Sequence, residues 1–183
     1  MDRRPKSRKP TQNKKVIVVG TSNTRAIDMD RFSTANWFAT WVEGMTISQA
    51  TAQINTIDFE PDCVVVHSGT NDLETKDTDL LITQHTEMIK HYRERFPDSQ
   101  IVISALLPRK GHSRNVYKIN AALQKEYSRQ DNTVFYSNSH FRIPENLPDF
   151  FIADDPKHLN KAGLNVFISG LKKSVSNSLY YDY

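Results

Sequence analysis

The sequence predicts one α/β domain, a three-layer α/β/α sandwich in which helices cover both faces of a five-stranded parallel sheet. Two kinds of segment alternate along the chain. Short apolar runs recur, as expected of strands that are buried on both faces. Between them lie segments with apolar residues three and four positions apart, as expected of amphipathic helices. Five such alternations favour right-handed crossovers between parallel strands. The 183 residues, 38% of them hydrophobic, suit one domain with a substantial core.

Five segments are predicted strands, in the sheet order 2-1-3-4-5. In chain order they are VIVVG (16–20), the weaker candidate WFATWV (37–42), CVVVHSG (63–69), IVISALL (101–107) and the edge-like TVFYS (133–137). In this order the topological switch point lies between the first and third strands, and open parallel sheets bind their ligands at the carboxyl ends of the strands there. The residues that follow these two strands are therefore the first candidates for a functional site.

Four helices are predicted around residues 47–57, 81–96, 116–127 and 164–175. His85 lies on the apolar stripe of the second helix, where we expect a hydrogen-bonded core histidine. Cys63 is the only cysteine, so it forms no internal disulfide and builds no cysteine-based zinc site; we expect it to be buried and inert. No phosphate-loop, dinucleotide-binding or metal-ligand spacing occurs, so we expect neither a metal nor a cofactor.

The folded domain is predicted to span residues 15–177, between a basic tail (1–14) and a C-terminal tail (178–183). Residues 1–15 contain seven Lys or Arg and one Asp, which favours a disordered segment. Such a segment either binds nucleic acid, directs nuclear import or is a solvated linker, and these alternatives stay open. We find neither a run of about 20 apolar residues nor a signal peptide, so we expect an intracellular protein, cytoplasmic or nuclear, without a transmembrane segment.

The residues after the first and third strands suggest acyl transfer. Ser22 follows the first strand and Asn71 the third, each on a predicted turn near a helix N-terminus, where free N–H groups favour negative charge. Acyl transfer needs a nucleophile, a base and donors for the oxyanion. Ser22 would supply the nucleophile and its own N–H, the Asn71 amide a second donor, and the N–H of Gly44, after the second strand, a third.

The candidate base lies close to the last helix. Asp155 and His158 are three residues apart in ADDPKHLNKAG, which we expect to be a loop folded back over the strand ends. The carboxylate would then hold one imidazole nitrogen while the other faces Ser22. Arg109, which follows the fourth strand at the same edge of the sheet, is expected either to receive an anionic substrate or a nucleic-acid phosphate, or to lie in a solvated loop.

Each of these residues also has a purely structural interpretation. Ser22 could cap a short helix, and Asn71 or Asp72 could cap the next one. His158 could simply lie in a loop that ends at a helix cap formed by Asn160. The three motifs together, in one order and each at a predicted boundary, favour a catalytic site over these alternatives.

Four sequence blocks resemble, in this order, those of SGNH (GDSL-type) hydrolases. They are GTSN, a glycine after the second strand, GTND and DPKHLNKAG. The resemblance spans Lys15 to Val175. It implies a flavodoxin-like fold, a metal-free esterase, and five site residues. These are the catalytic Ser22, His158 and Asp155, and the oxyanion-hole donors Ser22, Gly44 and Asn71. The first block departs from the usual Gly-Asp-Ser, because Thr21 replaces the acid that helps to set the turn.

A second likeness is narrower. HSGTNDL, together with LPRKG and NVYKIN, resembles esterase domains in first-open-reading-frame proteins of animal non-LTR retrotransposons. Two functions stay open: a serine esterase for acyl or acetyl esters, whose substrate could be a lipid, and a weak or inactive SGNH-like module that binds RNA, lipid or protein. The joint presence of all the side chains that catalysis needs favours the esterase. The sequence assigns no substrate-binding residues.

Overall fold

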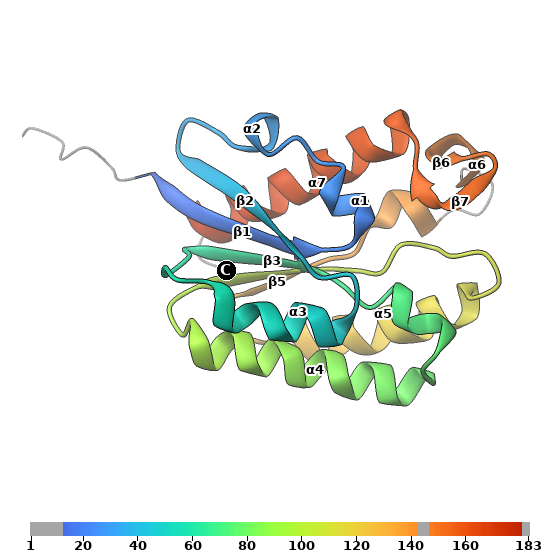
Figure 1. The fold of residues 1–183 in the computed structure, drawn as a ribbon, viewed down its shortest axis with the longest axis horizontal. Helices are drawn as coiled ribbons and strands as arrows, with labels where there is room; N and C mark the ends of the chain where they lie inside the picture. The colour runs from blue at the N-terminus through green and yellow to red at the C-terminus, as the bar shows by residue number, and fades with distance from the viewer. Residues whose placement is uncertain (1–12, 143–146, 181–183) are drawn as a thin grey trace, which may run out of the picture.

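The computed structural model describes residues 13–142 and 147–180. Its main sheet has five parallel strands in the predicted order β2-β1-β3-β4-β5 (Figure 1). The strands are β1 (Lys14–Gly20), β2 (Trp37–Glu43), β3 (Cys63–His67), β4 (Gln100–Ser104) and β5 (Thr133–Tyr136). The predicted basic tail lies outside the described residues, except at its last two positions.

Helices cover both faces of the sheet, which confirms the predicted three layers (Figure 1). One face carries α3 (Ile47–Gln53) with the 3-10 turn η1 (Ile54–Thr56), α4 (Thr78–Arg95) and α5 (Ser113–Tyr127). The other carries α1 (Ser22–Arg25), α2 (Met29–Phe32) and α7 (Lys161–Tyr180). α7 continues three residues past the predicted domain end at residue 177, and Ser178 in this last turn is buried.

Five further short elements lie between the longer strands and helices of the described residues. They are the 3-10 turns η2 (Asn71–Glu74) and η3 (Ser139–Arg142), the helix α6 (Leu147–Phe150) and the strands β6 (Phe151–Ile152) and β7 (Asp155–Leu159). β6 and β7 form an antiparallel hairpin where the sequence predicted a loop. That prediction was wrong because strands of two and five residues are too short to show a period.

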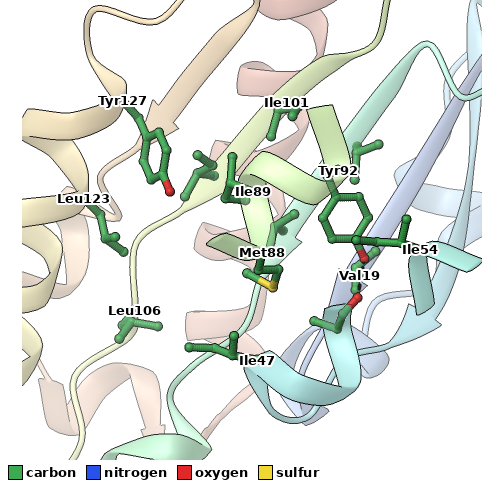
Figure 2. Close-up of a cluster of buried hydrophobic side chains, with 14 of the residues drawn as sticks. Val19, Ile47, Ile54, Met88, Ile89, Tyr92, Ile101, Leu106, Leu123 and Tyr127 are labelled. Carbon is green, nitrogen blue, oxygen red and sulfur yellow. Dashed lines mark hydrogen bonds between the residues drawn. The ribbon is translucent and has the colours of Figure 1, made fainter. Parts of the chain in front are cut away.

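The central strands are apolar because helices pack on both of their sides. Val64, Val65 and Val66 of β3 are fully buried. Figure 2 shows the cluster beneath α3, α4 and α5, in which the Tyr92 hydroxyl donates a 2.6 Å hydrogen bond to the Ala50 carbonyl. The opposite cluster is richer in aromatic rings, with Phe32, Trp37, Phe141, Phe151 and Phe167.

The strand ends are aligned at Gly20. This residue pairs with Glu43 of β2 on one side and with His67 of β3 on the other. The residues that follow all three strands therefore emerge at one edge of the sheet, as expected at a topological switch point.

Two buried histidines lie in this core. His67 and His85 are fully buried, and burial lowers the pKa of each to about 4. His67 shares a 3.1 Å hydrogen bond with the Ser104 hydroxyl, whereas the ring nitrogens of His85 have no partner among the described residues. The expectation that His85 is hydrogen-bonded was therefore wrong, although its burial was predicted. Cys63 is buried as expected, and burial raises its pKa to about 12, so the thiol stays protonated.

These histidines should make the protein less stable in acid. In the unfolded chain they protonate below about pH 6.5, but in the folded chain they stay neutral down to about pH 4. The unfolded state thus binds more protons across this window, and each histidine should remove about 1.4 kcal/mol of stability per pH unit as the pH falls. In His85→Leu, urea unfolding should show a shallower loss between about pH 6 and pH 5 than in wild type. Met88→Leu, on the same buried stripe, should keep the wild-type slope, and equal slopes in all three proteins would contradict the assignment.

The start of α7 holds the β6–β7 hairpin in place. The Asn160 side chain accepts a 2.9 Å hydrogen bond from the N–H of Gly163, which confirms the predicted cap. The backbone N–H of Asn160 donates to the Phe150 carbonyl at 2.9 Å. A Cβ atom at Gly163 would lie only 2.2 Å from that carbonyl oxygen. Only glycine lets the start of α7 lie this close to the end of α6, just before β6, without movement.

Gly163→Ala should therefore destabilise the protein and disturb the hairpin. The added methyl group meets backbone, which cannot move aside as a flexible side chain can, so we expect a loss of about 1–3 kcal/mol in urea unfolding. Asn165→Ala, at an exposed position on the same helix, should have little effect or stabilise slightly. Equal effects of the two substitutions would show that the contact at Gly163 is not tight.

Candidate active site

Ser22 lies on the turn between β1 and α1 and is the first residue of the helix. The backbone of Thr21 holds this turn: its N–H donates to the His67 carbonyl at 3.2 Å, and its carbonyl accepts from the N–H groups of Thr24 and Arg25. The hydroxyl of Thr24 adds a 2.7 Å bond to the same carbonyl. Thr21 occupies the cap position, so Ser22 is not a helix cap, and the turn forms without a carboxylate at position 21.

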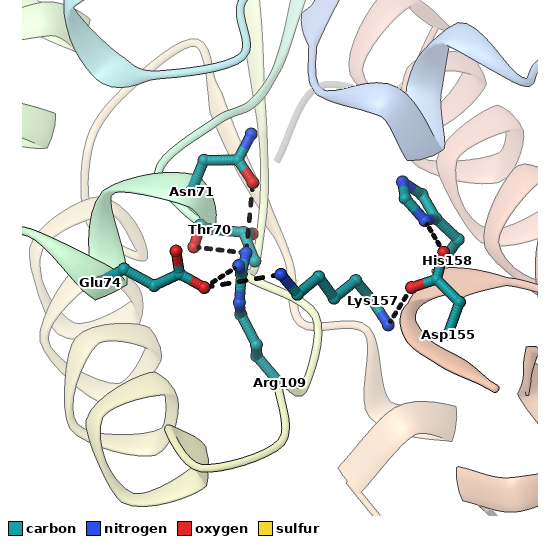
Figure 3. Close-up of polar contacts among 7 residues, drawn as sticks. All are labelled: Thr70, Asn71, Glu74, Arg109, Asp155, Lys157 and His158. Atoms are coloured by element: carbon teal, nitrogen blue, oxygen red, sulfur yellow. Dashed lines mark hydrogen bonds and ion pairs between the residues drawn. The ribbon is translucent and has the colours of Figure 1, made fainter. Parts of the chain in front are cut away.

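The structure brings Ser22, His158 and Asp155 into one hydrogen-bonded chain. Ser22 Oγ lies 2.9 Å from His158 Nε2, and His158 Nδ1 lies 2.5 Å from Asp155 Oδ2. Asp155 and His158 both belong to β7, and Figure 3 shows their side chains turned toward each other. The hydrogen bond from His158 holds the pKa of the Asp155 carboxyl below its usual range. An ionised Asp155 keeps the proton on Nδ1 and leaves Nε2 free to accept one from Ser22.

Asn71 is the first residue of η2, which three residues separate from the end of β3, and its amide is oriented by two partners. Nδ2 donates to the Met45 carbonyl at 2.9 Å, and Oδ1 accepts from the Arg109 guanidinium at 3.2 Å. The Nδ2 group thereby retains a second N–H beyond the one that Met45 takes. Thr70 holds the cap position, so neither Asn71 nor Asp72 caps this turn. Asp72 instead accepts from the N–H of Ile47, at the start of α3.

The structure differs from the prediction at Gly44. Its N–H donates to the Gly20 carbonyl at 2.9 Å, one position beyond the pairing of Gly20 with Glu43. The N–H expected to meet an oxyanion is therefore already used to extend the sheet. Glycine is required here for packing, because a Cβ atom would lie 2.8 Å from Val19 Cγ1 and 3.1 Å from Ala50 Cβ.

Arg109 is neither solvated nor free to receive an anion, which corrects both expectations. It is 6% exposed, and its guanidinium donates to the Thr70 carbonyl, to Asn71 Oδ1 and, at 2.5 Å, to Glu74 Oε1. This hydrogen bond lowers the pKa of the Glu74 carboxyl. Lys157 Nζ lies 3.6 Å from the same carboxylate. Figure 3 shows how Lys157 thereby links η2, which carries Asn71, to the hairpin that carries Asp155 and His158.

Within residues 13–142 and 147–180, no group of three or more His, Cys, Asp or Glu side chains is placed to hold a metal ion. In the same ranges, no helix combines the length and apolar character needed to cross a membrane. A cavity of about 320 Å³ lies beside the ends of β4 and β5. It is lined in part by Leu106, Val116, Asn138 and Phe141, and its lining does not include Ser22, His158 or Asp155.

Arg109→Met should lower stability more than the loss of a surface ion pair. It leaves the Thr70 carbonyl and Asn71 Oδ1 without their donor in a poorly hydrated place, so we expect a loss of about 2 kcal/mol in urea unfolding. Arg95→Met, which breaks the exposed pair between Arg95 and Glu60, should cost less than about 1 kcal/mol. A similar small loss for both would mean that water reaches Arg109 and replaces its hydrogen bonds.

Comparison with known proteins agrees with this architecture. The model of the GDSL-like Lipase/Acylhydrolase family matches residues 17–165. No curated protein matches the chain at a significant level.

Solved structures resemble the chain over most of its length. A GDSL-like lipase from Bacteroides thetaiotaomicron is 18% identical, with a TM-score of 0.72 over 91% of this chain and 89% of that one. A member of the lipolytic G-D-S-L family from Veillonella parvula is 17% identical, with a TM-score of 0.73 over 88% and 98%. A family 3 carbohydrate esterase from Clostridium thermocellum is 18% identical, with a TM-score of 0.71 over 92% and 98%. Likeness at this level of identity shows a shared fold.

Proposed function

The chain belongs to the GDSL-like lipase/acylhydrolase family, also called SGNH hydrolases, and on that basis we propose that it is a serine ester hydrolase. The observation that carries the proposal is the hydrogen-bonded chain from Ser22 through His158 to Asp155, with distances of 2.9 and 2.5 Å. Ser22 and His158 are 136 positions apart in the sequence. A serine hydroxyl, an imidazole and a carboxylate in this order are what nucleophilic acyl transfer requires.

In the first half of the proposed reaction, Ser22 becomes acylated. Its Oγ attacks the ester carbonyl carbon while its proton passes to His158 Nε2. Asp155 holds the imidazole through Nδ1 and stabilises the positive charge that the ring acquires. When the tetrahedral intermediate collapses, the bond to the alcohol oxygen breaks, and the alcohol leaves with the proton from His158.

The oxyanion that forms on the carbonyl oxygen needs hydrogen-bond donors. We assign this role to the remaining N–H of the Asn71 amide and to the backbone N–H of Ser22. The latter is the first N–H of α1, and such groups have no acceptor within a helix. The contacts of Asn71 with Met45 and Arg109 support this role, because a donor already held in place needs no reorganisation when charge develops. Gly44 is left out, since its N–H is used within the sheet.

In the second half, water releases the acyl group. His158 Nε2 removes a proton from the water, whose oxygen attacks the acyl carbon, and the proton then returns to Ser22 Oγ as the acid leaves. The proposed substrate class is carboxylic esters, acyl or acetyl. The likeness to the retrotransposon esterase domains, the binding of nucleic acid by the basic tail and the intracellular location all stay predictions.

The proposal is tested with purified protein and p-nitrophenyl esters from acetate to octanoate. Ser22→Ala and His158→Ala should each lower kcat by at least about 10³-fold, and the double variant should lose little more, because the two groups act as one unit. Asn71→Ala should lower kcat by about 10²- to 10³-fold, as expected for one oxyanion donor.

His140→Ala is the matched control. His140 is an exposed histidine that takes no part in the hydrogen bonds between Ser22, His158 and Asp155, so the variant should keep wild-type activity. Wild-type hydrolysis that equals that of Ser22→Ala for every ester would overturn the proposal. The alternative of a binding module that does not hydrolyse esters would then take its place.

A further inference from the structure

We propose that Asn23 is a positioning residue that holds the backbone of His158 in register with Ser22, an inference that rests on the proposed function. Asn23 lies within the GTSN block, whose pattern gives this residue no role of its own. The position could have been singled out only by its place next to the nucleophile. The contacts that carry the inference join segments far apart in the chain.

The Asn23 side chain binds the backbone on both sides of His158. Its Nδ2 donates to the Lys157 carbonyl at 3.2 Å, and its Oδ1 accepts from the N–H of Leu159 at 3.0 Å. In a β-strand, the carbonyl of one residue and the N–H of the second residue after it point to the same side. The amide of Asn23 therefore pairs with β7 as the peptide group of a neighbouring strand would.

Asn23 binds the edge of β7 that lies opposite to β6. The N–H of Asn160, next along the chain, points the other way and donates to the Phe150 carbonyl, on the side of α6 and β6. β6 has only two residues, and its register against β7 is irregular. Without Asn23, the segment that carries His158 would be paired on one side only, by a short and irregular strand.

Asn23 acts where water cannot easily replace it. The residue is 8% exposed, and its hydrogen bond with Leu159 is buried. The bond from Leu159 is therefore poorly exchanged for a bond to water, and its removal leaves a buried N–H unpaired. The bond to the Lys157 carbonyl is partly buried. Because Asn23 directly follows Ser22, one turn both presents the nucleophile and holds the base.

Asn23 and Asp155 constrain different parts of His158. Asp155 bonds to Nδ1 and so fixes the rotation of the ring. Asn23 bonds only to backbone groups and so fixes the strand from which the ring extends. A displacement of about 1 Å in such a site costs about 10²-fold in rate, which is the size of effect that a positioning residue can have.

The first readout is the kinetics of ester hydrolysis. Asn23→Leu keeps the volume of the side chain but removes both bonds, so kcat should fall by about 10- to 100-fold while KM stays within about twofold, because Asn23 reaches no substrate atom. Asn23→Ala serves if the leucine variant does not fold, since water can then enter and satisfy the two backbone groups. It should show the same loss in kcat.

The second readout does not depend on catalysis. In proton NMR of the protein without substrate, the His158 Nδ1–H bonded to Asp155 should give a downfield resonance, assigned by its absence in His158→Ala. Asn23→Leu and Asn23→Ala should broaden or shift this resonance, because a mobile backbone weakens the bond. Asn120→Leu is the matched control: the Asn120 amide also makes two backbone bonds, to the N–H and carbonyl of Leu106. It should lower stability to a similar extent but leave the resonance in place.

The outcomes separate the two proposals. An unchanged resonance and unchanged kcat in both Asn23 variants would overturn the role of Asn23. Losses of the same size in Asn120→Leu would also overturn it, since they would reflect general destabilisation. If wild type hydrolyses no ester but the resonance still depends on Asn23, the proposed function fails while the positioning of His158 by Asn23 stands.

Discussion

The site depends on the way that β1 ends between two parallel neighbours. Gly20 pairs with β2 and β3 at once, so three strands end at the same level and the loops after them converge. The end of β1 also leaves no room for a side chain, because a Cβ atom at Gly20 would lie 2.4 Å from Thr24 Oγ1 and 2.9 Å from the His67 carbonyl oxygen. The first turn of α1 therefore packs directly on the end of the sheet and presents Ser22 there.

The loop after β3 then organises the loop after β2. Ser68 donates to the Gly44 carbonyl, Asn71 donates to the Met45 carbonyl and Asp72 accepts from the N–H of Ile47. Three side chains from one segment thus bind two of the three residues between β2 and α3, and the first residue of α3. Because Arg109 holds the Asn71 amide from the other side, the proposed oxyanion donor is fixed by contacts rather than by the substrate.

The hairpin of β6 and β7 is the part of the site that local structure supports least. It has few residues of its own, and it is held by contacts with other elements: Gly163 and Asn160 at the start of α7, Asn23 after Ser22, and Lys157 toward Glu74. Lys157 and Glu74 are both about half exposed, so their ion pair contributes little free energy. The buried bond that Asn23 accepts from the Leu159 N–H is the stronger constraint, because water competes with it less.

The sequence by itself determined the three layers, the five strands in their order and the presence of Ser22, Asn71, Asp155 and His158 near strand and helix boundaries. The layers, the strands and the residues at their boundaries follow from apolar periodicity and from turn residues, which act over a few positions and can be counted along the chain. The strand order was expected as a common order of doubly wound sheets. Only the tertiary structure decided that β7 is a strand, that the N–H of Gly44 belongs to the sheet and that Arg109 is buried against Asn71. It alone revealed the bonds of Asn23. The contacts of Gly44, Arg109 and Asn23 each depend on a partner at least 24 residues away, and no local pattern specifies which distant hydrogen-bonding group a polar side chain or a free N–H will meet. The strand β7 was missed for another reason, since it pairs with a neighbouring strand of only two residues that shows no period.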